Sequence, residues 1–382
     1  MPKSSSENTT RTERQGRSVS AGALIAIIAA ALLAIAALLW FTALRGISDR
    51  RVEAPPAQTP STAADEPDES PAAPPQIVTA TDPEPPAQTE PEDTPEAGRP
   101  DDAASVQPAG AFDGTPAAET DATQTLNLQL YSENAILIDV ETNTVIAEKA
   151  PDARIYPASM TKIMTALVAC EQIENWDDTF RMTQTIIDPL YLADATLAGF
   201  VNGEDVNMLD LVYGTILPSG AEATEALAIQ LAGSEEAFVE LMNEKAAELG
   251  LQDTHFVDAS GLHDEEHYTT VRDMSIILRA AMENEVCRQV LSTASYTSAS
   301  TEQHPDGVDM YNKFLLRVAS ADQNGAQIQG AKTGYTAQAM NCCASFGRSP
   351  SGRQLLCVTA HAWTGDFCIE DHIALYSTYN GE

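Results

Sequence analysis

The 382-residue chain carries 21 lysine and arginine residues against 56 aspartate and glutamate residues, a formal net charge of -35. So acidic a chain is a poor candidate for nucleic-acid binding, which needs clustered positive charge. The charge divides the chain into residues 1–51 with a net +4, residues 52–124 with a net -15 and residues 125–382 with a net -24. Only the last segment has the composition of a folded domain, and it is long enough to bury one large core.

The first two segments have the composition of a membrane anchor and a linker. Residues 19–44 contain no charged side chain and are long enough to cross a bilayer. We expect them to form an uncleaved transmembrane signal anchor after a short tail, residues 1–18, with a cleaved signal peptide as the alternative. Residues 45–124 hold most of the prolines and many acidic residues but few large apolar ones, so we expect a disordered, extended linker.

The folded segment, residues 125–382, opens with a predicted hairpin followed by a helix. Residues 135–140 and 145–147 are short apolar runs on either side of the polar turn 141–144, a pattern typical of a β-hairpin. After Pro157 the chain continues as an apolar run with few helix breakers up to Cys170. This run predicts a helix.

The rest of the segment predicts further helices and then strands. Residues 206–248 have a helical pattern that is interrupted at residues 217–220, and Thr270-Val-Arg-Asp273 resembles a capping box that opens a helix to about Glu283. Three closing strands are expected at residues 327–335, 341–346 and 354–360. A strand pair, central helices and late strands together indicate an α+β fold, a sheet with helices packed on it.

Three short motifs carry candidate chemistry. Ser159-Met-Thr-Lys162 stands at the start of the first helix, and residues three apart lie on one helix face. The amine would act as a base only if it is neutral, and burial and nearby positive charge both lower a lysine pKa. Lys332-Thr333-Gly334 follows a strand-like run, and its lysine would supply such a charge. Ser219 stands in the helix break. Each motif alone is weak evidence for catalysis, because the same residues also occur at these spacings on protein surfaces that have no catalytic role.

The three motifs gain specificity from their order, with gaps of about 60 and about 110 residues. With them the sequence resembles the penicillin-binding-protein type D-alanyl-D-alanine carboxypeptidases, the low-molecular-mass serine D,D-peptidases. Residues 157–165 and 330–336 are similar to the family's first and third motifs almost residue for residue, and the resemblance covers roughly residues 130–380. It implies the penicillin-recognising serine transpeptidase/β-lactamase-like fold, an antiparallel sheet with helices and a mainly helical lobe.

The resemblance also implies a role for each motif residue. Ser159 would be the acylated nucleophile, Lys162 its general base, and Ser219 the relay that passes the proton to the departing D-alanine. Lys332 and Thr333 would bind the terminal carboxylate of the peptide. Neither a cofactor nor a metal is expected.

The remaining implied features concern the oxyanion and the location of the enzyme. Gly334 permits close backbone approach, and the backbone N–H groups of Ser159 and Tyr335 would form the oxyanion hole. The implied partners are peptidoglycan stem peptides ending in D-Ala-D-Ala and β-lactams as covalent inhibitors. An enzyme of this type, together with the acidic stretch after residues 19–44, predicts a single-pass protein of the cell membrane with its catalytic domain outside the cytoplasm.

One departure from the family leaves rival functions open. The second motif of the family is usually Ser-x-Asn, but here it is Ser219-Gly220-Ala221. The lost amide would cost about 1–3 kcal/mol if its partners stay buried and unpaired, and Glu222 or Thr224 are the candidates for compensation. A weakly active or non-catalytic peptidoglycan-binding relative is therefore the first alternative, and a β-lactamase is the second.

Two other patterns suggest different chemistry. His263-Asp-Glu-Glu-His267 fits the H-x-x-E-H pattern of a zinc peptidase, but it reads as a polar loop, whereas that chemistry needs both histidines on one helix face. The six cysteines all lie in the folded segment. Cys343 and Cys357 flank a turn-like stretch at nearly equal distance. If this stretch is a hairpin, the two cysteines would face each other. The sequence is then compatible either with a disulfide between them or with two buried free thiols.

Overall fold

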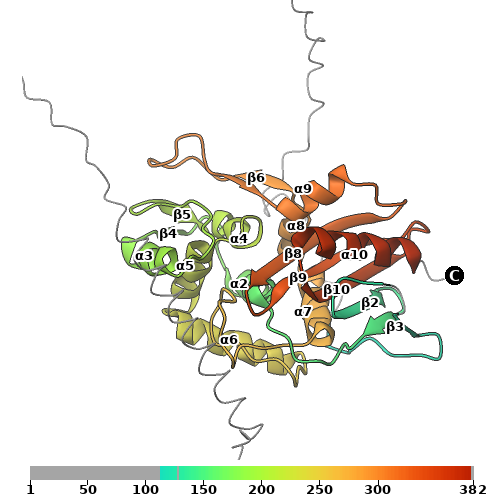
Figure 1. Ribbon diagram of the computed structural model, residues 1–382. Coiled ribbons are helices and arrows are strands. Elements are labelled where there is room, and N and C mark those ends of the chain that lie inside the picture. Colours follow the sequence, from blue (N-terminus) through green and yellow to red (C-terminus); the bar gives the residue numbers. More distant parts are fainter. Residues whose placement is uncertain (1–111, 127–128, 380–382) are drawn as a thin grey trace, which may run out of the picture. The chain divides into compact units, whose positions relative to one another are not determined.

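A six-stranded sheet with helices on both faces organises the protein, for which a computed structural model describes residues 112–126 and 129–379 (Figure 1). The strand order is β1-β3-β2-β10-β9-β8. All neighbours are antiparallel except β1 with β3, so the expected antiparallel sheet carries one short parallel strand at its edge. The strands are β1 (Gln124–Thr125), β2 (Asn134–Asp139), β3 (Thr144–Lys149), β8 (Gln327–Thr336), β9 (Met340–Arg348) and β10 (Gln354–Ala362).

The two faces of the sheet bury different sets of side chains. Because side chains alternate along a strand, Ile136 and Ile138 of β2 face one core while Ala135 and Leu137 face the other. The first core is shared with α2 (Thr161–Gln172), α7 (Val271–Glu283) and α8 (Glu285–Ser292). The second core is shared with α9 (Lys313–Ser320) and α10 (Gly365–Thr378).

A second lobe, mainly helical, lies beside the sheet (Figure 1). It contains two short hairpins that are separate from the main sheet. Its elements are β4 (Thr179–Arg181), α3 (Gln184–Leu192), β5 (Asp205–Asn207), α4 (Met208–Ile216), α5 (Ala221–Ala232) and α6 (Glu235–Glu248), and the second hairpin is β6 (Ser295–Thr297) with β7 (Asp309–Tyr311).

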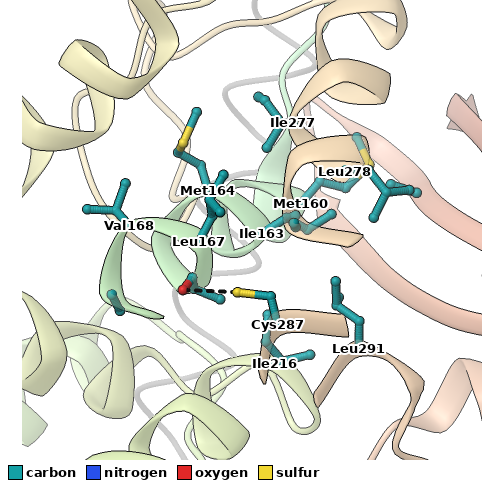
Figure 2. Close-up of a cluster of buried hydrophobic side chains, with 14 of the residues drawn as sticks. Met160, Ile163, Met164, Leu167, Val168, Ile216, Ile277, Leu278, Cys287 and Leu291 are labelled. Carbon is teal, nitrogen blue, oxygen red and sulfur yellow. Dashed lines mark hydrogen bonds between the residues drawn. The ribbon is translucent and has the colours of Figure 1, made fainter. Parts of the chain in front are cut away.

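Helix α2 is the central element between the sheet and the helical lobe. All its residues from Thr161 to Ala169 are buried, as expected for a helix that is covered on every side. Figure 2 shows Met164 and Leu167 of α2 packed among side chains of α4, α7 and α8, and the Cys287 thiol donates a 3.4 Å hydrogen bond to the Ala166 carbonyl oxygen. The start of α2 is therefore held rigidly.

Most of the predicted elements are confirmed. The hairpin, the α2 run, the helices on either side of the break, and the three closing strands are present with ends shifted by a few residues at most. Thr270 caps α7 by accepting a hydrogen bond from the Asp273 N–H at 3.0 Å. The remaining helices, α3, α8, α9 and α10, are elements that the sequence patterns did not single out.

Two predictions concern the N-terminal part. Residues 112–124 fall in the expected linker, yet they lie along the sheet: the Ala118 N–H donates to the Asn143 carbonyl oxygen at 2.9 Å, and Phe112 packs against the core. The folded part thus begins before residue 125. The expected anchor, residues 19–44, lies outside the described residues. Among the residues that the structure does describe, no helix is both long and apolar enough to span a bilayer.

Candidate active site

Ser159 lies in a short 3₁₀ turn, η2 (Ala158–Met160), directly before α2. Ala158 has a φ of +46°, in the left-handed region that non-glycine residues rarely adopt. Gly261, at φ +85°, passes so close to the Ala158 carbonyl that a Cβ there would collide with it. The backbone before Ser159 is therefore fixed in an unusual conformation by a loop of the helical lobe.

Lys162 lies one turn further along and reaches Ser159 as its spacing predicts. The amine donates a 3.3 Å hydrogen bond to the Ser159 hydroxyl oxygen and a 2.6 Å bond to the Ser260 carbonyl oxygen. The side chain is only 3% exposed. Burial lowers the pKa of Lys162 to about 8, against the opposing charges of Asp258, Glu222 and Glu235. With this pKa about a tenth of the amine is neutral at pH 7, and that fraction is able to accept a proton.

Lys332 projects from β8 toward the helix break. Its amine donates hydrogen bonds to the Ser219 hydroxyl oxygen at 3.0 Å and to the Thr333 carbonyl oxygen at 2.8 Å. Burial, followed by the positive charge of Lys162, lowers the pKa of Lys332 to about 7. The charge of Lys162 thus contributes to the lowered pKa of Lys332, whereas the pKa of Lys162 is lowered by burial and not by the charge of Lys332 that the sequence suggested.

Ser219 occupies the turn between α4 and α5. It has a φ of +70°, and two backbone bonds hold the turn around it. The Gly220 N–H donates to the Gly214 carbonyl at 2.8 Å, and the Ala221 N–H donates to the Thr196 carbonyl at 2.8 Å. A strained, well-anchored turn of this kind is often associated with function, and here it directs a hydroxyl at Lys332.

Gly334 is the point at which β8 meets the turn of the nucleophile. A Cβ at this position would lie 2.8 Å from the Pro157 carbonyl oxygen and 2.9 Å from the Ser159 backbone nitrogen. Only glycine fits without displacing that backbone. The close approach brings the backbone of β8 alongside the Ser159 N–H, where an oxyanion would be bound.

A single cavity of about 380 Å³ joins these groups. Its wall includes the side chain of Ser159 from η2, Ser219 from the helix break, and Lys332 from β8, while Lys162 lies beneath Ser159. The predicted substrate-binding residues also line it, namely Thr333, Gly334 and Tyr335. The structure therefore gathers all seven predicted site residues around one cavity.

Ala221 stands at the first position of α5 and is 3% exposed. The two proposed substitutes for the missing amide are engaged elsewhere. The Thr224 hydroxyl donates to the Gly220 carbonyl oxygen at 2.8 Å, and Glu222 Oε1 accepts from the N–H groups of Gly199 and Phe200 at 2.8 Å and 3.3 Å. Glu222 influences Lys162 only through its charge.

Sequence reasoning missed the support beneath Lys162. Asp258 accepts hydrogen bonds from the backbone N–H groups of Ser260 and Gly261 at 2.7 Å and 2.6 Å, and His267 lies 3.3 Å from its other oxygen. Burial opposes ionisation of Asp258, but these hydrogen bonds outweigh it and lower the pKa to about 2. This carboxylate fixes the turn whose Ser260 carbonyl holds Lys162. The only sequence feature that could have indicated this role of Asp258 is the pattern Asp-x-Ser-Gly, which is common in turns.

His267 also resolves the zinc-peptidase alternative. Residues 263–267 form a turn-containing loop and not a helix, with His263 exposed and His267 buried. The His267 Nε2 atom lies 2.8 Å from the Thr161 hydroxyl, so the ring links the loop to α2. The two histidines therefore do not share the helix face that the motif requires.

The prediction that Cys343 and Cys357 lie directly opposite each other on neighbouring strands is wrong. Cys343 lies opposite Thr359, and Cys357 lies opposite Ser345, so the two cysteines are diagonal neighbours on one face of the sheet. The centre of the hairpin turn lies one residue later in the sequence than a Cys343–Cys357 pairing would require. All six cysteines are free thiols.

Comparison with known proteins identifies the family of this fold and site. Residues 119–362 match the family model described as D-alanyl-D-alanine carboxypeptidase. The chain is 30% identical over 244 residues to D-alanyl-D-alanine carboxypeptidase DacF of Bacillus subtilis, covering 63% of this chain and 60% of DacF. It is 33% identical over 186 residues to the D-alanyl-D-alanine carboxypeptidase of Streptomyces sp. strain K15, covering 47% of this chain and 64% of the relative. The chain thus spans less than two thirds of the length of these relatives.

Solved structures share the same architecture. The crystal structure of the Streptomyces K15 DD-transpeptidase superposes with a TM-score of 0.59 at 28% identity, covering 66% of this chain and 98% of the other. Penicillin binding protein 5 from Haemophilus influenzae superposes with a TM-score of 0.56 at 25% identity, covering 65% and 70%. The sheet, the helical lobe and the matched residues lead to one assignment: this chain belongs to the D-alanyl-D-alanine carboxypeptidase family, with the penicillin-recognising serine enzyme fold.

Proposed function

We propose that the protein is a serine D-Ala-D-Ala carboxypeptidase that removes the terminal D-alanine from peptidoglycan stem peptides through an acyl-enzyme on Ser159. The observation that carries this proposal is the hydrogen bond from the buried Lys162 amine to the Ser159 hydroxyl at the floor of the cavity. An amine with a lowered pKa at that position can take the proton as the oxygen attacks.

In the acylation step the Ser159 oxygen attacks the carbonyl carbon of the penultimate D-alanine and gives its proton to neutral Lys162. The negative charge that develops on the carbonyl oxygen is stabilised by the backbone N–H groups of Ser159 and Tyr335. The proton then passes to the departing amine of D-alanine through Ser219. Water attacks the ester in the second step, which regenerates the Ser159 hydroxyl and releases the shortened peptide.

Substrate binding uses the opposite wall of the cavity. Lys332 and Thr333 receive the terminal carboxylate of the peptide, and the charge of Lys332 is available for this in its protonated form. A β-lactam carries a carboxylate beside its strained amide and would acylate Ser159 by the same attack. It would act as a covalent inhibitor, because the amine released when the ring opens remains part of the acyl group bound to Ser159.

Release of D-alanine from a synthetic peptide ending in D-Ala-D-Ala tests the proposal. We expect the wild-type full chain to release D-alanine, Ser159→Ala to release none above background, and Ser377→Ala, a change in α10 away from the cavity, to match the wild type. A folded wild-type protein that binds the peptide without releasing D-alanine would instead favour the non-catalytic binding relative, which the alanine at position 221 supports.

We further propose that residues 19–44 anchor the protein in the cell membrane, with residues 1–18 in the cytoplasm and the catalytic domain outside. The uncharged apolar sequence of this segment supports the proposal, as does the location of the peptidoglycan substrate. Fractionation of cells that express the full chain should place it in the membrane, and protease added to intact spheroplasts should remove the catalytic domain.

A further inference from the structure

A cluster of sulfur and nitrogen ligands lies beneath α10, and the proposed hydrolysis does not use it. The ligand atoms of Cys343 on β9 and of Cys368 and His372 on α10 all lie within 4.8 Å of one another. All three side chains are buried, with exposures of 0% to 1%. None of them contacts Ser159 or Lys162 through a hydrogen bond in the described structure.

The fold itself brings these residues together. The β9–β10 register places Cys343 opposite Thr359 and Cys357 opposite Ser345, and Cys343 and Cys357 face the core under α10. Cys368 and His372 are four residues apart on α10 and therefore share one helix face, and α10 lies along the sheet in Figure 1. Strand β9 and helix α10 thus bring two sulfur atoms and one imidazole nitrogen into one small volume, and Cys357 of β10 lies in the same core.

The histidine is oriented by partners on its far side. The His372 Nδ1 atom lies 2.7 Å from the Ser345 hydroxyl, which in turn lies 3.1 Å from the Tyr376 hydroxyl. The Nε2 atom lies 2.9 Å from the Thr359 hydroxyl, which in turn lies 3.6 Å from the Cys368 sulfur. A metal-binding histidine commonly has one ring nitrogen hydrogen-bonded and the other bonded to the metal, so an ion at Nε2 would replace the Thr359 hydroxyl as the partner of that nitrogen.

We propose that Cys343, Cys368 and His372 bind a zinc ion, with Cys357 as the fourth ligand. Tetrahedral zinc with bonds of about 2.3 Å holds its ligand atoms about 3.8 Å apart, so atoms already within 4.8 Å need to move by about an ångström or less. The Cys357 thiol is not one of these three atoms, but it lies on the same face of the sheet as Cys343 and in the same buried core, so its side chain would have to turn toward the ion. Three cysteines and one histidine form a common ligand set of structural zinc sites, and thiolates select soft metals.

Zinc binding would release the thiol protons of the coordinating cysteines to solvent and involves no electron transfer. The ion would tie α10 to β9 and β10 more firmly than the side-chain packing and the hydrogen bonds of His372 and Tyr376 do there. Because Gly365, Cys368 and Ile369 also line the catalytic cavity, the same ion would stiffen one wall of the active site. It would act as a structural ion and would not touch the substrate.

Metal content of the full chain, purified without an affinity tag, tests the proposal. After incubation with zinc chloride and gel filtration, we expect close to one zinc per chain by mass spectrometry of the elements. Cys343→Ser with Cys368→Ser should reduce the zinc content at least tenfold, whereas Cys170→Ser, in α2, should retain it. In cobalt-loaded wild type, a sulfur-to-cobalt charge-transfer band with strong visible bands would establish tetrahedral thiolate ligation.

The wild-type measurement decides the question even if the double variant does not fold. A folded wild-type chain that retains no zinc above background and shows no charge-transfer band with cobalt would overturn the proposal. So would a Cys343–Cys368 disulfide, found by peptide mass mapping of protein that was purified without reductant and reloaded with zinc. Neither result would bear on D-alanine release, so the failure of this site and the failure of the hydrolase are distinguishable.

Discussion

The chemistry of individual side chains centres on two buried lysines with different tasks. Lys162 donates to Ser159 and Lys332 to Ser219; in the proposed mechanism Lys162 must be neutral to accept the proton of Ser159, and Lys332 must be charged to bind the carboxylate. Burial lowers the pKa of both, to about 8 and about 7 respectively. Because their charges interact, the titration steps observed in an experiment belong to the pair.

The pH profile of acylation should therefore be bell-shaped. As the pH rises through about 8, more Lys162 becomes neutral and the rate rises, while Lys332 loses its charge as the pH rises through about 7 and binding weakens. The product of the two fractions is greatest between these values. Stopped-flow acylation by a chromogenic β-lactam measures the profile, and a rate that keeps rising through the alkaline range would show that the charge of Lys332 is not needed.

Ala221 is the residue at which a gain of activity is expected. An asparagine restores a hydrogen-bond partner worth about 1–3 kcal/mol, so Ala221→Asn should raise kcat/KM by about tenfold for a D-Ala-D-Ala peptide. Ala232→Asn, at the other end of α5, is the matched control and should leave kcat/KM unchanged. Equal values for Ala221→Asn and the wild type would mean that this cavity binds the substrate amide by other groups.

At the scale of the elements, the site depends on how closely β8 approaches the turn before α2. Gly334→Ala places a methyl group within 3 Å of the Pro157 oxygen and the Ser159 nitrogen, so one of the two segments must move. We expect acylation to slow by about 100-fold or more, because small displacements of reacting groups are costly. Gly352→Ala, in the β9–β10 turn with nothing within 4 Å, costs some stability because Gly352 has a φ of +87°, but it lies outside the cavity wall and should retain the wild-type acylation rate.

The sequence predicted those elements whose pattern is local. The β2–β3 hairpin, α2 and the Thr270 cap of α7 each depend on side chains a few residues apart. Helix α10 was missed although its first turn is capped by Thr364, because its buried side includes cysteine, histidine and tyrosine and so lacks a simple apolar period. Asp258 and His267 could not be assigned their roles, since each acts on α2 through contacts that only the folded chain creates.

At the scale of the whole molecule, an acidic domain presents a basic cavity. Residues 125–382 carry a net charge of -24, yet the charged residues that line the cavity are three basic ones, Lys313, Arg317 and Lys332, and one acidic one, Asp194. Such an arrangement favours a ligand with a carboxylate and disfavours binding to anionic polymers elsewhere on the domain. The two lobes supply different parts of the site, so a change in either is expected to alter catalysis.

The most direct test of the central claim is to locate the acyl group after reaction with a β-lactam. The full chain is incubated with a penicillin, digested and analysed by peptide mass spectrometry. We expect a single adduct on the peptide that contains Ser159, and no adduct in Ser159→Ala. An adduct on another residue, or no adduct on folded protein at saturating drug, would contradict the assignment of Ser159 as the nucleophile that Lys162 activates.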